Sequence, residues 1–232
     1  MMNKQSLLFS LLFFCLLALS PTGFAAQNTL LDPFDEIRAS GRVNIRLEPA
    51  EGGAVNIPEE EDQVSVEVRS GILYVKRKDR WKPRNYKKGI DVVVSYQKLR
   101  RITGEAGAEV SSSFPLVTAD GLRLSFGSGA KADLEVKLED LEVNVGEGAE
   151  LELRGYTDEL TARASTGGIL EAFGLQSKRT YVRANTGGEA EVMATEHLEA
   201  NANTGGNISY RGNPNKTFLS SELGGDIDGS GL

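Results

Sequence analysis

Apolar and polar residues alternate in short runs along most of this chain. The alternation is clear in residues 122–126, 134–138, 141–145 and 198–202. A period of two is typical of half-buried β-strands. Beyond the first 25 residues, no segment shows the 3.6-residue period over a length that would favour a helix. The pattern therefore predicts an all-β fold.

Glycine-containing turns recur between these strands at intervals of about 20 residues. Seven such marks are present, at Gly107, Gly129, Gly148, Gly168, Gly188, Gly206 and Gly225. The marks at 164–168, 184–188 and 202–206 are near copies, reading ASTGG, ANTGG and ANTGG. A repeat this short cannot bury its own apolar face, so successive copies must stack. The spacing predicts a parallel β-solenoid with about 20 residues per coil.

The glycines are expected at the corners of the coils, where a positive φ is inexpensive only for Gly or Asn. Stacked corners are expected to form polar columns with hydrogen bonds between coils, one of Ser165, Asn185 and Asn203 and one of Thr166, Thr186 and Thr204. An antiparallel β-sandwich is the structural alternative, because short strands with turn signals suit it too. A nucleotide-binding loop is disfavoured, since neither of the usual glycine-rich phosphate motifs occurs.

Strand-like alternation continues with looser spacing in the front part of the chain. We expect one domain over residues 34–232, in which 34–103 form an irregular β part and 104–232 the regular repeats. An open stack needs its first coil covered. The irregular part is therefore predicted to act as an N-terminal cap.

The first 25 residues have the pattern of a secretory signal peptide. A short basic segment precedes an apolar run, Leu7–Leu19, and small residues lead up to Ala25. The run is shorter than the roughly 20 residues that a membrane-spanning helix needs, so a retained anchor is disfavoured. Cys15 lacks the small neighbours expected of a lipidation site. We predict a signal peptide over 1–25 and a flexible segment over 26–33.

The composition of the chain limits the ligands and the kinds of site that it can have. The chain has 33 acidic and 26 basic residues, a net charge of −7, which argues against binding to nucleic acid or to an anionic membrane. It contains one Cys and one His, which excludes a Cys/His zinc site and a disulfide framework. No cofactor is expected. After removal of the signal peptide no cysteine remains, so the fold must be stable outside the cytoplasm without disulfides.

A basic segment interrupts the irregular part. Residues 76–88 contain eight Lys and Arg in thirteen positions. Its candidate ligand-binding residues, for an anionic glycan or a lipid phosphate, are Trp81, Lys82, Arg84, Tyr86, Lys87 and Lys88. The favoured interpretation is structural, a solvated hairpin loop whose charge keeps the sheet edge soluble.

A second candidate site is acidic. Glu171, Glu191, Ser209 and Asp228 each follow a corner glycine by three residues. Stacking would place Glu171 and Glu191 about 5 Å apart, a spacing that a retaining glycosidase or a calcium site uses. No His, Tyr or Arg cluster accompanies them at matching positions, and outward positions of soluble strands are often acidic. We therefore expect no enzyme activity.

Three segments, together with the glycine corners, resemble a known family. They are Phe34–Ile45 (FDEIRASGRVNI), Leu99–Gly104 (LRRITG) and Ile208–Pro214 (ISYRGNP). Over about residues 34–232 the chain resembles the putative auto-transporter adhesin, head-GIN domain family. The resemblance implies an exported protein of Gram-negative bacteria of the Bacteroidetes type, a right-handed parallel β-helix-like fold and no established enzyme activity. It implies no catalytic residues, and no translocator barrel follows the repeats.

These observations predict an exported, non-enzymatic β-solenoid that acts in adhesion or scaffolding. The expected location is the periplasm, the outer-membrane surface or the extracellular space, with no transmembrane segment in the mature chain. The expected partners are a surface glycan or another cell-envelope protein, and no nucleic acid. Unpaired strand edges at the ends of the stack would allow a homo-oligomer. The alternative is a carbohydrate-binding or polysaccharide-processing β-helix.

Overall fold

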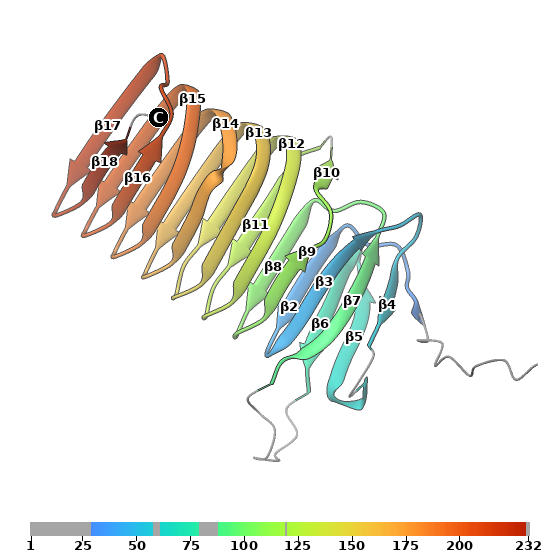
Figure 1. Cartoon of the computed structure of the whole chain (residues 1–232). Helices are drawn as coiled ribbons and strands as arrows, with labels where there is room; N and C mark the ends of the chain where they lie inside the picture. The colour runs from blue at the N-terminus through green and yellow to red at the C-terminus, as the bar shows by residue number, and fades with distance from the viewer. Residues whose placement is uncertain (1–28, 58–60, 79–87, 119, 231–232) are drawn as a thin grey trace, which may run out of the picture.

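A computed structural model describes residues 29–57, 61–78, 88–118 and 120–230 and shows one elongated stack of β-strands (Figure 1). The strands of the N-terminal region are β1 (Thr29–Leu30), β2 (Glu36–Ser40), β3 (Val43–Pro49), β4 (Ala54–Asn56), β5 (Val64–Arg69), β6 (Ile72–Arg77) and β7 (Ile90–Tyr96). The strands that follow are β8 (Arg101–Glu105), β9 (Glu109–Ser112), β10 (Leu116–Thr118), β11 (Leu122–Phe126), β12 (Lys131–Val145), β13 (Glu150–Ser165), β14 (Ile169–Asn185), β15 (Glu189–Asn203), β16 (Asn207–Arg211), β17 (Lys216–Glu222) and β18 (Asp226–Ser230). The described residues include one helical element, the single 3-10 turn Glu61–Gln63, and contain no helix able to cross a membrane.

Successive coils run in the same direction. Lys131 pairs with Glu150, Glu150 with Ile169, and Ile169 with Glu189, so neighbouring positions in the stack lie 19 or 20 residues apart in sequence. The fold is a β-solenoid of about seven turns. The prediction of a parallel solenoid is confirmed, and the β-sandwich alternative is wrong for the repeats because all their pairings are parallel.

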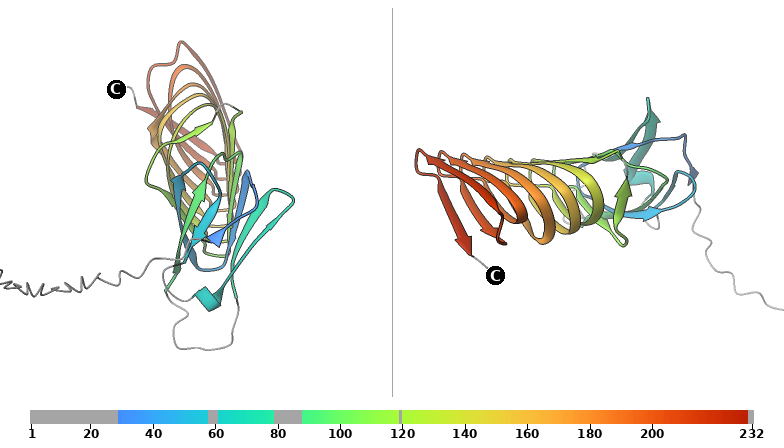
Figure 2. Two further views of the ribbon diagram at one scale, coloured as in Figure 1. Left: turned by 90° about the vertical axis from the view of Figure 1, so that its right-hand side faces the viewer. Right: turned by 90° about the horizontal axis from the view of Figure 1, so that it is seen from above.

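Each coil is flattened, as the view along the stack shows (Figure 2), and it has two broad faces. We call face A the surface formed by β2, β8, β11, the C-terminal parts of β12–β15, and β17. Face B is formed by β3, β9, the N-terminal parts of β12–β15, β16 and β18. Alternate residues point into the narrow interior. The expected inward residues Leu170, Ala190 and Ile208 are at most 2% exposed, and Ile227 is partly buried against them.

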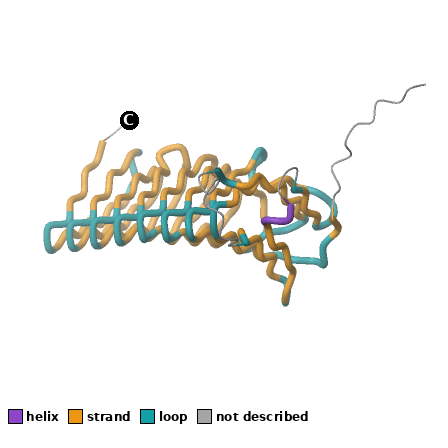
Figure 3. Tube along the Cα trace, turned by 90° about the horizontal axis from the view of Figure 1, so that it is seen from below, coloured by secondary structure: helices purple, strands orange, loops and turns teal. Residues whose placement is uncertain are grey.

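The corner that joins face A to face B repeats at one place in every coil, and these turns form a straight column along the stack (Figure 3). Two successive residues of the turn have positive φ, for example Thr166 at 51° followed by Gly167 at 70°. The expectation that only Gly or Asn would occupy such positions is wrong, because Thr186 and Thr204 repeat the conformation of Thr166. Backbone hydrogen bonds between coils offset the strain, such as that from Gly187 N to Thr204 O at 3.3 Å.

The second glycine of each pair is required for a different reason. Gly168 lacks a positive φ, but a Cβ there would lie 2.5 Å from the carbonyl oxygen of Val145 in the preceding coil. The paired glycines therefore combine one conformational and one steric requirement. The predicted column of Ser165, Asn185 and Asn203 is in register, although the side-chain amide of Asn203 donates to Asn201 on its own strand.

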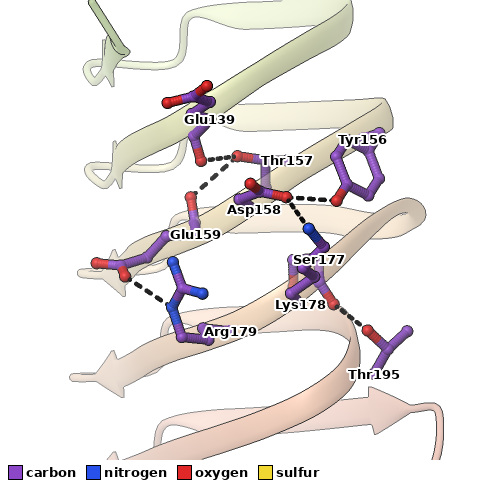
Figure 4. A network of polar contacts seen from close by, with 9 residues as sticks. All are labelled: Glu139, Tyr156, Thr157, Asp158, Glu159, Ser177, Lys178, Arg179 and Thr195. Atoms are coloured by element: carbon purple, nitrogen blue, oxygen red, sulfur yellow. Dashed lines mark hydrogen bonds and ion pairs between the residues drawn. The ribbon is translucent and has the colours of Figure 1, made fainter.

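The opposite side of each coil is a bend within a continuous strand, and buried hydroxyl groups satisfy its backbone. The Thr157 hydroxyl lies 3.0 Å from the carbonyl oxygens of Glu139 and Glu159 (Figure 4). In the next coil the Ser177 hydroxyl donates to the carbonyl of Met193 at 2.9 Å, and Thr195 donates to the carbonyl of Ser177 at 3.1 Å. These bonds let the strand change direction without leaving buried polar groups unpaired.

In the N-terminal region, chain order and stacking order differ. β2 pairs with β6 on one side and β8 on the other, and β3 pairs in the same way with β7 and β9. The β6–β7 coil therefore lies outside the β2–β3 coil, although it comes later in sequence. Antiparallel strands then cover this end, β5 beside β6 and β4 beside β7. An irregular N-terminal β region is thus present as predicted.

Candidate functional site

The acidic column predicted from the sequence lies on face B. Glu171 of β14 pairs in register with Glu191 of β15, so their backbones are one strand spacing, about 4.8 Å, apart. Ser209 and Asp228 continue the column on β16 and β18. Both glutamates point outward, with Glu171 exposed and Glu191 half-buried.

The column is longer than the spacing of the glycines predicts. Glu152 pairs with Glu171, and Asp133 pairs with Glu152, so four acidic residues follow one another across four coils. Arg154 joins the two added carboxylates, at 2.5 Å from Asp133 and 2.6 Å from Glu152. The hydrogen bond to Glu152 raises the pKa of the Arg154 guanidinium, with the charge of Asp133 adding to it.

The two halves of this acidic column differ in charge compensation. In the described part of the chain, no cationic group lies within 4 Å of Glu171 or Glu191. The same residues contain no cluster of three or more His, Cys, Asp or Glu arranged to hold a metal ion. A shallow depression of about 540 Å³ covers face B from β7 to β14 and includes Glu171 at its edge. The arrangement gives face B a negative strip open to solvent.

The basic segment is described only at its ends. Trp81, Lys82, Arg84, Tyr86 and Lys87 lie outside the described residues. Lys88 is exposed, and its carbonyl oxygen accepts a hydrogen bond of 2.7 Å from Arg77. This contact closes the base of the segment between β6 and β7, beside the N-terminal end of the stack.

A compact charged cluster covers the outside of the strand bend (Figure 4). Asp158 accepts hydrogen bonds from Lys178, at 2.7 Å, and from the Tyr156 hydroxyl. The bond from Lys178 lowers the pKa of the Asp158 carboxyl, and the bond from Tyr156 lowers it further. Arg179 pairs with Glu159 at 3.1 Å, which raises the pKa of the arginine. The two ion pairs join the β13 and β14 coils. Within each pair the opposite charges neutralise each other.

Face A has a feature that was not predicted from the sequence. Arg163 of β13 and Arg183 of β14 are paired in register and exposed. Asn144 precedes them in the same column and Asn201 follows them. The signal was present in the sequence, because each arginine lies five residues before a corner glycine, Gly168 or Gly188.

A row of rings lies beside this column. Tyr181 and His197 have ring centroids 5.5 Å apart, and His197 and Phe218 follow at 5.6 Å, both pairs tilted by 48°. His197 is half-buried between the two, whereas Phe218 is 59% exposed. The one histidine of the chain therefore belongs to a row of rings across three coils of face A.

Comparison with known families agrees with this architecture. Residues 33–214 match the family described as putative auto-transporter adhesin, head GIN domain. The chain belongs to this family. The match includes the irregular N-terminal part and most of the coils, which confirms the resemblance drawn from the sequence. No curated protein matches the chain.

Solved structures with the same fold come from Bacteroides and Parabacteroides species. A putative adhesin from Bacteroides fragilis superposes with a TM-score of 0.78 at 20% identity, covering 88% of this head GIN domain chain and 95% of its own. A putative adhesin from Parabacteroides distasonis has a TM-score of 0.69 at 19% identity, with the same coverage. A protein from that species described as a putative lipid binding protein has a TM-score of 0.63, again at 19% identity and the same coverage. At these identities the likeness concerns the fold.

Proposed function

We propose that this head GIN domain protein is exported and acts without catalysis, in adhesion or scaffolding at the cell surface or in the periplasm. The observation that carries the proposal is the family match over residues 33–214. The signal-peptide pattern of residues 1–25 supports export. The solenoid supports a binding role, because it displays two long faces on which side chains repeat at every coil.

Fractionation of cells that express the full chain tests export. We expect the protein outside the cytoplasm, with a mass that corresponds to cleavage after Ala25. Placing a charge in the apolar run, with Leu11→Arg and Leu16→Arg, should retain it uncleaved in the cytoplasm. Cells that display the protein should adhere to glycan-coated surfaces better than cells that lack it. An uncleaved cytoplasmic wild-type chain would refute export, and equal adhesion of the two strains would refute the adhesive role.

A second candidate function is polysaccharide processing on face B. The observation that favours it is the in-register pairing of Glu171 with Glu191, whose spacing approaches that of a retaining carboxylate pair. Turnover assays on anionic polysaccharides test it with Glu171→Gln and Glu191→Gln. Glu189→Gln, on the neighbouring outward column, is the matched control. Cleavage that both test variants abolish and the control retains would establish an enzyme and overturn the non-enzymatic proposal.

Self-association at the β17–β18 end belongs to the same proposal. Among the described strands, β17 pairs only with β15 and β18 only with β16, so one edge of each is unpaired. Antiparallel pairing of β17 with its copy about Leu219 would place Lys216 opposite Glu222, a complementary pair. Sedimentation should then show a dimer that Lys216→Glu weakens and that Lys216→Glu with Glu222→Lys restores. A wild-type monomer at all concentrations would exclude it.

A further inference from the structure

Almost every arginine in the described part of the chain has a partner. Arg123 pairs with Glu142 at 2.6 Å, and Arg211 lies over the ring of Phe173 at 4.0 Å. Arg163 and Arg183 are the exceptions among the described arginines, since no carboxylate lies within 4 Å of either guanidinium and no ring lies beneath it.

These two arginines also differ from the like-charged pair Arg101 and Arg123, whose members contact Glu36 at 4.0 Å and Glu142 at 2.6 Å. At several places opposite charges face each other across coils, as in the pairs Arg123 with Glu142 and Glu159 with Arg179. Arg163 and Arg183 instead place two positive charges in register, about 4.8 Å apart along the backbone. Like charges at directly opposite positions are destabilising. A protein of net charge −7 has enough carboxylates to neutralise the pair, so the uncompensated charge indicates an external anion.

The surroundings provide further groups for a ligand. A depression of about 360 Å³ is lined by both arginines together with Asn144, Thr161 and Tyr181. Two carboxylates line it as well: Glu142, which is held by Arg123, and Glu199, which follows Tyr181 in the next coil. The row of rings that begins at Tyr181 continues along the stack beside the depression. Guanidinium groups, side-chain amides and aromatic rings therefore lie within one strip of face A.

We propose that this strip binds an acidic polysaccharide whose chain crosses the coils, with uronate carboxylates on Arg163 and Arg183 and sugar rings against Tyr181 and His197. The proposal rests on the proposed binding role and names its ligand class. Arginine presents two parallel N–H donors that match the two oxygens of a carboxylate. Ring faces accept the apolar side of a sugar, and the amides of Asn144 and Asn201 extend the row of donors.

The charge of the molecule favours this ligand over denser polyanions. Nucleic acids carry a phosphate charge every few ångströms and demand a broad basic surface. Face A offers only two adjacent described arginines without carboxylate partners, on an acidic protein. A shallow strip of half-buried rings and amides also suits an extended chain of sugars better than the single headgroup of a lipid.

Titration of the purified full chain with oligogalacturonate tests the proposal directly. Arg163→Gln and Arg183→Gln should each weaken binding about tenfold, and the double variant should abolish it, because each removes a charge-assisted hydrogen-bond pair. Tyr181→Ala should weaken binding without changing its salt dependence. Arg154→Gln removes the same charge from face B and is the matched control. Both face A arginines are exposed and repel each other, so their replacement should not lower the melting temperature.

Three outcomes would overturn the inference. The first is a wild type that does not bind oligogalacturonate, and the second is a double variant that binds it as the wild type does. The third is displacement of the sugar by vesicles of anionic phospholipid that bind through Arg163 and Arg183, which would assign the strip to a lipid instead. None of these results depends on export or on cell adhesion, so they are distinguishable from failure of the proposed function.

Discussion

The two ends of the stack are built differently. At the N-terminal end, the β6–β7 coil is covered by antiparallel strands β5 and β4, and Leu73 in β6 is completely buried. At the other end, β17 and β18 each keep an unpaired edge in the described structure, and Phe218, Leu219 and Leu223 are 59%, 48% and 80% exposed. One end is closed by its own chain and the other is open.

The difference shows how stability is distributed along a solenoid. Each coil contacts its neighbours alone, so the stability of the molecule is close to a sum of coil terms and interface terms. A coil with two neighbours gains two interfaces, and the β17–β18 coil gains one. Local opening should therefore begin at the β17–β18 end and not at the covered end. Equivalent substitutions should accordingly cost less at the open end.

The largest difference is expected between a buried leucine at the covered end and a half-exposed leucine at the open end. Leu73→Ala should lower the free energy of unfolding by about 2–5 kcal/mol, because it leaves a cavity between β2 and β5. Leu219→Ala should cost less than about 1 kcal/mol, since half of that side chain is already exposed. Urea unfolding of the two variants measures both costs. Equal costs would show that a partner covers the β17–β18 end in solution.

Corner glycines provide a second test of the same asymmetry. A Cβ on Gly206 would lie 2.3 Å from the carbonyl oxygen of Ala184, and one on Gly225 equally close to that of Ala202. Gly206→Ala should cost about 3 kcal/mol, because coils on both sides hold it in place. Gly225→Ala should cost about 1 kcal/mol, because the last coil can move away.

The control for these glycines is Gly205→Ala. Gly205 has a φ of 69°, but a Cβ at this position would meet no atom within 4 Å. Its substitution should cost about 1–2 kcal/mol from backbone strain alone. Thermal unfolding of the three variants compares these costs. If Gly206→Ala were no worse than Gly205→Ala, steric contact between coils would not explain the second glycine.

The smallest expected effect is a loss of folding stability at alkaline pH that arises from one tyrosine at the covered end. Burial raises the pKa of the Tyr96 phenol in β7 above its ordinary value of 10.0. Above that value the unfolded chain ionises while the folded chain stays neutral. The stability contribution is therefore complete below about pH 10 and is lost as the pH rises through the folded pKa. Unfolding measured at several alkaline pH values should show a decline for the wild type that Tyr96→Phe reduces. Identical declines in stability for the wild type and for Tyr96→Phe would contradict this role of Tyr96.

The repeats were predictable because their signals are local. Two-residue alternation marks the strands, and paired glycines such as Gly187 and Gly188 mark the corners. The position of the β6–β7 coil was not predictable in this way. Its neighbours β2 and β3 precede it by 36 residues (Glu36 to Ile72) and 47 residues (Val43 to Ile90), and pairing over that distance leaves no periodic pattern in the sequence.

The candidate sites show in the same way that only residues marked by a local sequence signal could be predicted. Glu171 and Glu191 were found because both follow a glycine pair at one offset. Asp133 and Glu152 were missed because Ala130 and Ala149 stand where later coils have the second glycine, which shifts the count by one. A pattern counted from glycine alone fails in the coils that have alanine in place of the second corner glycine.

The order of the first coils determines how this molecule can assemble during synthesis. β2 and β3 are made before β6 to β9, yet they come to lie between the β6–β7 coil and the β8–β9 coil. The structure therefore grows outward in both directions from its earliest element. The pairing of β2 and β3 with the β6–β7 coil cannot be complete until residues up to Tyr96 have been made. From there onward, each further coil can be added in the order in which it is made.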